Sequence, residues 1–188
     1  MQIISKEALN LKQQMKNLGN VRGLALCGLL TAMYIVMSYF NIVITDTMQI
    51  RLGFLVIAAA ALYGGPMMGL TVGTLGDILS MILTGGKGSS YFFGFTVSYA
   101  LMGFLFGLVF HKSKVSIPRA IAGGLVEFII SIFLNTYWLS TMFGIPYISN
   151  FLTRLPKSAV MFGINTVLLF VIMNAFHVAI KRAHIITD

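Results

Sequence analysis

Charged residues are scarce in this sequence. Only 10% of its 188 residues are Asp, Glu, Lys or Arg, whereas 57% are hydrophobic. A soluble domain usually carries about a quarter charged residues, so this chain has too few charges to cover a surface in water. The composition excludes an ordinary soluble domain and predicts a protein whose solvent is the lipid bilayer.

Cysteine and the common catalytic motifs are almost absent too. The single cysteine, Cys27, excludes an intrachain disulfide and cannot build a metal cluster. The glycine-rich segment 85–90 is not a P-loop, because Gly88 follows Lys87 where Ser or Thr is required. The sequence has no HExxH motif. We therefore expect no enzyme activity, no cofactor and no resident metal.

Long uncharged runs are what the sequence has instead. Each is longer than 20 residues, and they cover 23–45, 52–76, 88–110, 128–153 and 158–180. A helix needs about 20 apolar residues to cross a bilayer, and these continuous runs lack the alternation of a β-barrel. The predicted fold class is therefore an all-α, polytopic membrane protein.

Six transmembrane helices fit these runs. We expect them at about 23–40, 52–64, 66–83, 92–110, 120–138 and 157–178. Gly64-Gly65-Pro66 is a turn signal that divides the second run in two; one long tilted helix is the alternative. A loop that contains Gly144-Ile145-Pro146 is expected over 139–156.

The positions of the basic residues predict how the chain is oriented in the membrane and which segments lie outside the membrane domain. Nine of the thirteen Lys and Arg residues fall on the side of both chain ends, which the positive-inside rule places in the cytoplasm. Residues 1–22 are expected to form a basic tail or an interfacial helix, 23–182 the membrane domain, and 183–188 a C-terminal tail. Since these charges flank apolar runs, the net charge of +8 does not indicate nucleic-acid binding.

The other basic residues share the external half of the bundle with several polar and aromatic residues. Asp77 lies within a span, where a carboxylate is costly and usually functional; a structural pair with Arg51 or Lys157 is the alternative. Belt or snorkelling roles are the alternatives for the interfacial residues. The candidate binding residues are Arg51, Asp77, Tyr91, Phe93, Ser98, Asn135, Tyr137, Trp138, Arg154 and Lys157.

Glu127 is a second carboxylate within a span. At a rise of 1.5 Å per residue it lies about 12 Å deeper than Asn135 along the fifth helix. We therefore place it outside the expected site. Its alternative roles are pairing with a basic residue, contact with a partner subunit, or a protonated position in the interior.

Several of these segments together resemble the substrate-binding S components of energy-coupling factor (ECF) vitamin transporters, over residues 22–182. The shared features are a small-residue helix face at Gly28 and Ala32, similar to the family's Ala-x-x-x-Ala, and the run of Gly64, Gly65, Pro66, Gly69, Gly73 and Asp77. Segments 91–95 and 135–139, with Gly144, Pro146, Arg154 and Lys157 downstream, are similar to the folate-specific branch.

The resemblance implies a high-affinity, folate-binding S component of the bacterial plasma membrane. Its partners would be a transmembrane coupling subunit, which Gly28 and Ala32 would contact, and two ATPases that supply the energy for uptake. In the site, Asp77 and Asn135 would read the pterin, aromatic residues would stack on the rings, and the cationic residues would attract the glutamate. A component for another vitamin, such as riboflavin, and a free-standing secondary transporter are the alternatives.

Overall fold

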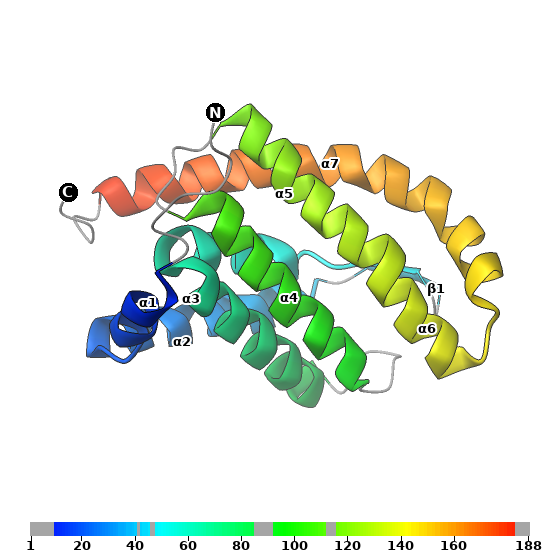
Figure 1. The fold of residues 1–188 in the computed structure, drawn as a ribbon, viewed down its shortest axis with the longest axis horizontal. Coiled ribbons are helices and arrows are strands. Elements are labelled where there is room, and N and C mark those ends of the chain that lie inside the picture. The colour runs from blue at the N-terminus through cyan, green and yellow to red at the C-terminus, as the bar shows by residue number, and fades with distance from the viewer. Residues whose placement is uncertain (1–9, 41, 46–47, 85–91, 112–115, 183–188) are drawn as a thin grey trace.

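The structure is a computed structural model that describes residues 10–40, 42–45, 48–84, 92–111 and 116–182. Helices account for nearly all of these residues (Figure 1). The α-helices are α1 (Leu11–Leu18), α2 (Val21–Ser38), α3 (Gly53–Thr84), α4 (Phe93–Phe110), α5 (Ile117–Ile129), α6 (Asn135–Phe143) and α7 (Tyr147–Arg182). The π-helix η2 (Ile130–Leu134) joins α5 to α6.

Five helical segments among the described residues are long and apolar enough to cross a membrane. They are α2, α3, α4, the α5–η2–α6 rod and α7. Since α3 contains two of the six expected spans, the predicted helical, polytopic class is confirmed. The described ends of the chain, α1 and the end of α7, lie at the same end of the molecule (Figure 1).

The long helix α3 is two helices that fold back on each other. Gly65 has φ 78° and ψ −170°, a backbone conformation essentially restricted to glycine, and Pro66 follows it. A Cβ atom built on Gly69 would lie 3.0 Å from the Cβ of Ala61, although these residues would be about 12 Å apart along one straight helix. The turn predicted at 64–66 is confirmed.

The first half of α3 is the centre of the bundle. Residues Ile57 to Ala61 have no exposed surface. Its second half packs backbone to backbone on α4, because Gly69 and Gly103 face each other without side chains between them. This close approach is the reason for glycine at both positions.

Helix α1 covers the break in α3. Gln14 is only 5% exposed, and its Oε1 accepts a hydrogen bond of 3.4 Å from the backbone N–H of Met67. The helix break leaves this N–H without an intrahelical partner, so the amide side chain replaces it. The neighbouring Met15 is 57% exposed.

A short antiparallel ribbon joins α2 to α3. Strand β1 (Ile42–Thr45) pairs with β2 (Met48–Ile50). This ribbon was not predicted, because it lies between the expected spans at 23–40 and 52–64, where only a connection was expected. The ribbon ends one residue before Arg51, which it delivers to the edge of the bundle.

The connection between the last two spans is shorter than predicted. The fifth span continues to Phe143 and ends at Gly144, whose φ of 66° is typical of a helix C-terminus, and α7 begins at Tyr147. The predicted loop over 139–156 is therefore wrong. Pro156 lies inside α7 and bends it instead of ending it, as the change in direction near its start shows (Figure 1).

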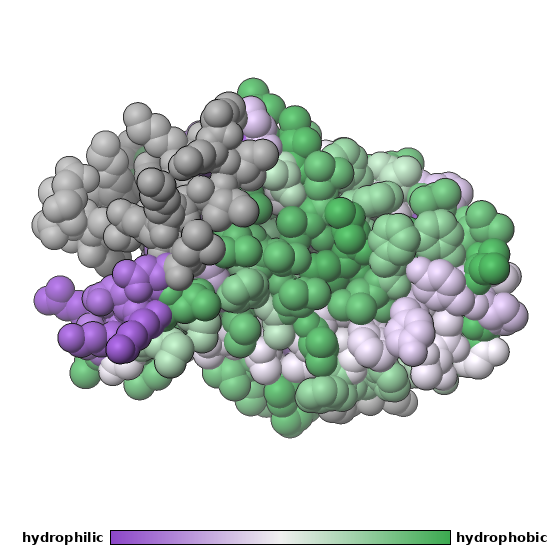
Figure 2. Space-filling model, in the orientation of Figure 1, coloured by the Kyte–Doolittle hydropathy of each residue, from purple (hydrophilic) through white to green (hydrophobic). Residues whose placement is uncertain are grey.

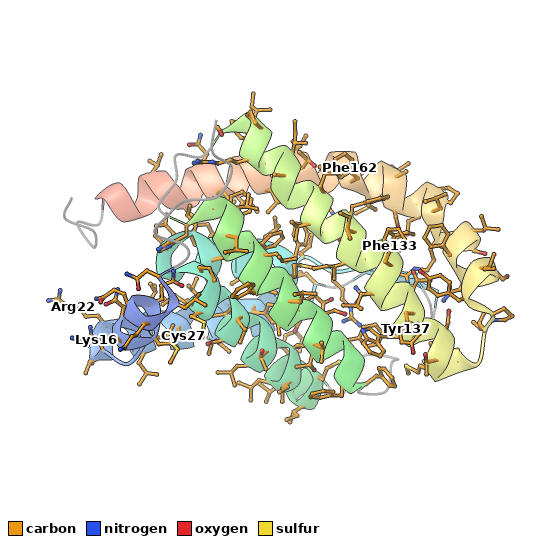
Figure 3. The ribbon with its side chains drawn as sticks, in the orientation of Figure 1. Lys16, Arg22, Cys27, Phe133, Tyr137 and Phe162 are labelled. Carbon is orange, nitrogen blue, oxygen red and sulfur yellow. The ribbon has the colours of Figure 1, made fainter. Side chains whose placement is uncertain are left out.

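The outer surface matches a lipid environment. Figure 2 shows apolar residues over the middle of the molecule and a hydrophilic patch over α1 at one end, where Lys16 and Arg22 lie (Figure 3). Large apolar side chains are exposed along α2, α5 and α7, among them Leu29, Leu125 and Val167. In water such a surface would be an aggregation hazard, whereas in a bilayer it is the expected contact with lipid.

Candidate functional site

A cavity lies between the ribbon end, α3, α4, the α5–η2–α6 rod and α7. Its walls combine aromatic rings, methionine side chains and several polar or charged groups, as ligand pockets commonly do. It is lined by Arg51, Phe54, Phe95, Tyr99, Met102, Glu127, Phe128, Ser131, Asn135, Leu139, Met142, Phe143, Arg154, Lys157, Ser158, Met161 and Asn165.

The lining residues of the α5–η2–α6 rod recur every four positions. They include Glu127, Ser131, Asn135, Leu139 and Phe143. On an α-helix of 3.6 residues per turn this spacing would drift by about 40° at each step. The wider π-turn of η2, in which the N–H of Asn135 donates to the carbonyl of Ile130, offsets part of this drift. The π-helix therefore keeps Glu127 and Asn135 on one wall.

Helix α7 forms the opposite wall with one face. Arg154, Ser158 and Asn165 are buried at helical spacing and all line the cavity. The Nε and Nη1 atoms of Arg154 are buried without a hydrogen-bond partner. Asn150 fixes the start of α7 against α6, because its Nδ2 donates to the Ser140 hydroxyl at 3.1 Å.

Arg51 is held over two aromatic rings of α4. Its Nη1 donates to the Tyr99 hydroxyl at 3.2 Å, and its guanidinium lies 5.5 Å from the centre of the Phe95 ring. Arg51 is also close enough to Arg154 for the two positive charges to repel each other. Like charges held together beside a cavity favour an anion between them.

Glu127 lies on the wall of this cavity, although the sequence placed it outside the expected site. Its depth relative to Asn135 was estimated from the helix rise, but the cavity extends along the rod to both levels. The Nδ2 of Asn165 donates to Glu127 Oε2 at 3.0 Å. Asn165 lines the cavity but was not among the predicted residues; its spacing of eleven from Arg154, about three helical turns, was the available signal.

Asp77 is not among the residues that line the cavity. It is 2% exposed, and its Oδ2 accepts a hydrogen bond of 2.7 Å from the Thr96 hydroxyl between α3 and α4. Ser98 and Trp138 also pair with each other, because the indole Nε1 donates to the Ser98 hydroxyl at 3.1 Å. None of these three predicted residues is among those that line the cavity.

Of the remaining predicted residues, two do not line the cavity and one lies outside the residues that the structure describes. Tyr137 is 52% exposed on α6 (Figure 3), and Phe93 is 67% exposed at the start of α4. Both positions are typical of aromatic residues at a membrane interface. Tyr91 lies outside the described residues.

Gly28 and Ala32, the predicted docking pair, lie on the exposed face of α2. A Cβ atom added at Gly28 would meet no atom within 4 Å. This face of α2 is therefore open in the isolated chain.

The arrangement suits a small anion with a flat ring system. Arg51, Arg154 and Lys157 supply positive charge, and Phe95, Tyr99 and Phe128 supply apolar ring surface. Within the described part of the chain, no three His, Cys, Asp or Glu side chains come together as a metal site would need.

Comparison with known proteins agrees with this description. The family model for the ECF transporter substrate-specific component matches residues 22–180. The folate transporter FolT of Clostridium novyi (strain NT) is 33% identical over 137 residues, which are 72% of this chain and 78% of that protein. FolT of Leuconostoc mesenteroides is 27% identical over 162 residues, which are 82% of this chain and 86% of that protein.

A solved structure shares the fold as well. The crystal structure of FolT bound with folic acid superposes with a TM-score of 0.73 at 26% identity, covering 82% of this chain and 92% of that one.

Proposed function

Because the chain belongs to the family of ECF transporter substrate-specific components, we propose that it is the subunit that binds folate for uptake across the bacterial plasma membrane. Folate has a flat pterin, a benzoyl linker and a glutamate with two carboxylates. The observation that carries the proposal is the cavity that combines three cationic side chains with aromatic walls. The likeness to folate transporters and to a folic-acid complex supports the same substrate.

The cationic residues account for the anionic end of the ligand. Arg51 and Arg154 lie within electrostatic range of each other. The positive charges of Lys157 and Arg154 also repel each other. A carboxylate between them would relieve the repulsion and give Arg154 acceptors for its unsatisfied Nε and Nη1 donors. Thiamine, a cation, would meet repulsion at the same place.

Transport requires partners in this proposal. The chain has no nucleotide-binding motif, and its family is one of transporter components, so energy for uptake would come from two ATPases through a transmembrane coupling subunit. The open small-residue face at Gly28 and Ala32 supports docking of that subunit, because small residues let helices approach closely. The basic chain ends support a cytoplasmic location for both termini.

Uptake in reconstituted vesicles tests the proposal. Vesicles that contain this chain with the coupling subunit and both ATPases are expected to accumulate labelled folate only when ATP is supplied on the ATPase side. Vesicles with this chain alone should bind folate without accumulating it. Accumulation by the chain alone would favour a free-standing secondary transporter, and absence of folate binding would overturn the substrate.

A further inference from the structure

The cavity wall carries a pair of hydrogen-bond acceptors that the anion site does not use. Asn165 Nδ2 donates to Glu127 Oε2 at 3.0 Å. This bond fixes the orientation of the amide, since turning it over would place its oxygen against the carboxylate. Asn165 Oδ1 therefore faces away from Glu127. It is buried without a hydrogen-bond partner, and Asn165 as a whole is 4% exposed.

Both residues line the cavity, so each can present a hydrogen-bond acceptor to a ligand. The carboxylate of Glu127 keeps lone pairs on both oxygens after accepting from Asn165, and Asn165 Oδ1 accepts as well. Buried polar groups are nearly always satisfied in native proteins, and a buried carboxylate within a membrane span is costly unless it has partners. Hydrogen-bond donors on a ligand would satisfy both.

Asn165 is separated from Arg154 along the cavity, whereas Glu127 lies within electrostatic range of Lys157. Asn165 follows Arg154 by eleven residues on α7, a distance of about 16 Å at the α-helical rise. The Nε and Nη1 atoms of Arg154 are unsatisfied donors near one end of this stretch of α7, and Asn165 Oδ1 is an unsatisfied acceptor at the other end. The apolar side chains of Phe128 and Met161 line the cavity as well. The cavity thus presents orphan donors at Arg154 and acceptors at Glu127 and Asn165, as an elongated ligand with an anionic end and a donor-bearing end would require.

We propose that Glu127 and Asn165 recognise the donor edge of the pterin, which consists of its ring N–H and the adjacent amino group. A carboxylate can accept from two adjacent donors at once, and Asn165 Oδ1 would accept the second hydrogen of the amino group. The glutamate of the ligand then lies at Arg51 and Arg154. This inference rests on the proposed folate function, and it gives Glu127 the specificity role that the sequence analysis assigned to Asp77.

The test compares wild type with Glu127→Gln in calorimetric titrations of the intact, detergent-purified chain. The ligands are folate and N-(4-aminobenzoyl)glutamate, a fragment that lacks the pterin. Loss of a charge-assisted bidentate contact is expected to weaken folate binding about tenfold to hundredfold, while binding of the fragment stays within about twofold. Arg154→Ala is the matched control and should weaken both ligands.

A folate analogue without the 2-amino group completes a thermodynamic cycle. Wild type should bind it more weakly than folate, whereas Glu127→Gln should barely distinguish the two, because the removed groups contact each other. Independent, multiplying losses would overturn the assignment, as would an equal loss for folate and the fragment or no loss in Glu127→Gln. Failure of wild type to bind folate would instead overturn the proposed function.

Discussion

The guanidinium of Arg51 donates a hydrogen bond to the Tyr99 hydroxyl at 3.2 Å and lies above the rings of both Tyr99 and Phe95. Arg51 is the first residue after the ribbon, so its backbone is anchored by β2 and its side chain by α4. The contact joins a connecting segment to the cavity wall. It also holds a positive charge within electrostatic range of Arg154 on the cavity wall.

We expect Arg51→Lys to weaken folate binding by about tenfold or more. Lysine keeps the charge but loses the planar fork and the stacking on the rings. The dissociation constant from calorimetry measures the effect, with Tyr99→Phe as the matched variant that removes only the hydroxyl and should cost less. Equal affinity in wild type and Arg51→Lys would mean that Arg51 does not contact the ligand.

Gly103→Ala should destabilise the chain by about 1–3 kcal/mol, as overpacking does. A Cβ atom at this position would overlap the backbone of Gly69 on α3. Thermal unfolding of the detergent-solubilised protein measures the change. Gly163→Ala on α7 is the control, because a Cβ there meets no atom within 4 Å. Similar melting of the two variants would argue against the close α3–α4 contact.

Gln14→Ala should lower the melting temperature, because it leaves the backbone N–H of Met67 without the acceptor that now covers the break in α3. The loss of one such partner costs roughly 1–3 kcal/mol. Gln13→Ala in the same helix removes only an exposed hydrogen bond to Asn17 and should have little effect. If the two variants melt together, α1 does not support the turn at 64–66.

Asp77→Asn should change the dissociation constant for folate by less than about threefold. The asparagine oxygen can still accept the Thr96 hydrogen bond, and the side chain does not line the cavity. Asp77→Ala leaves that hydroxyl without this acceptor and should reduce stability by roughly 1–3 kcal/mol. A large loss of affinity in Asp77→Asn with unchanged melting would restore a direct role in pterin recognition.

Most of the fold followed from charge-free runs and one turn signal. Length and hydropathy suffice to locate spans because the bilayer imposes both. The turn in α3 requires a positive φ at residue 65, which glycine adopts readily. The start of α7 did not follow, because a proline inside a membrane helix can bend it without ending it. The β1–β2 ribbon depends on pairing between strands, which a search for helices does not detect.

The candidate site was predictable only in part. Arg51, Asn135, Arg154 and Lys157 were singled out as polar groups near one end of the bundle, and they line the cavity. The sequence did not reveal which side chains point into the cavity. Tyr137 was therefore included although it faces outward, and Asp77 was included although it contacts Thr96. Glu127 was left out because the helix rise places it about 12 Å deeper than Asn135, whereas the cavity extends along the rod to both residues.

Titration of the purified chain with folate tests most directly whether it is a folate-binding component. We expect saturable, one-to-one binding in detergent without ATP or partner subunits, and no comparable response to riboflavin or thiamine. Arg154→Ala should bind folate at least about tenfold more weakly. Absence of folate binding by folded protein, or equal binding of riboflavin, would contradict the claim that this chain is a folate-binding component.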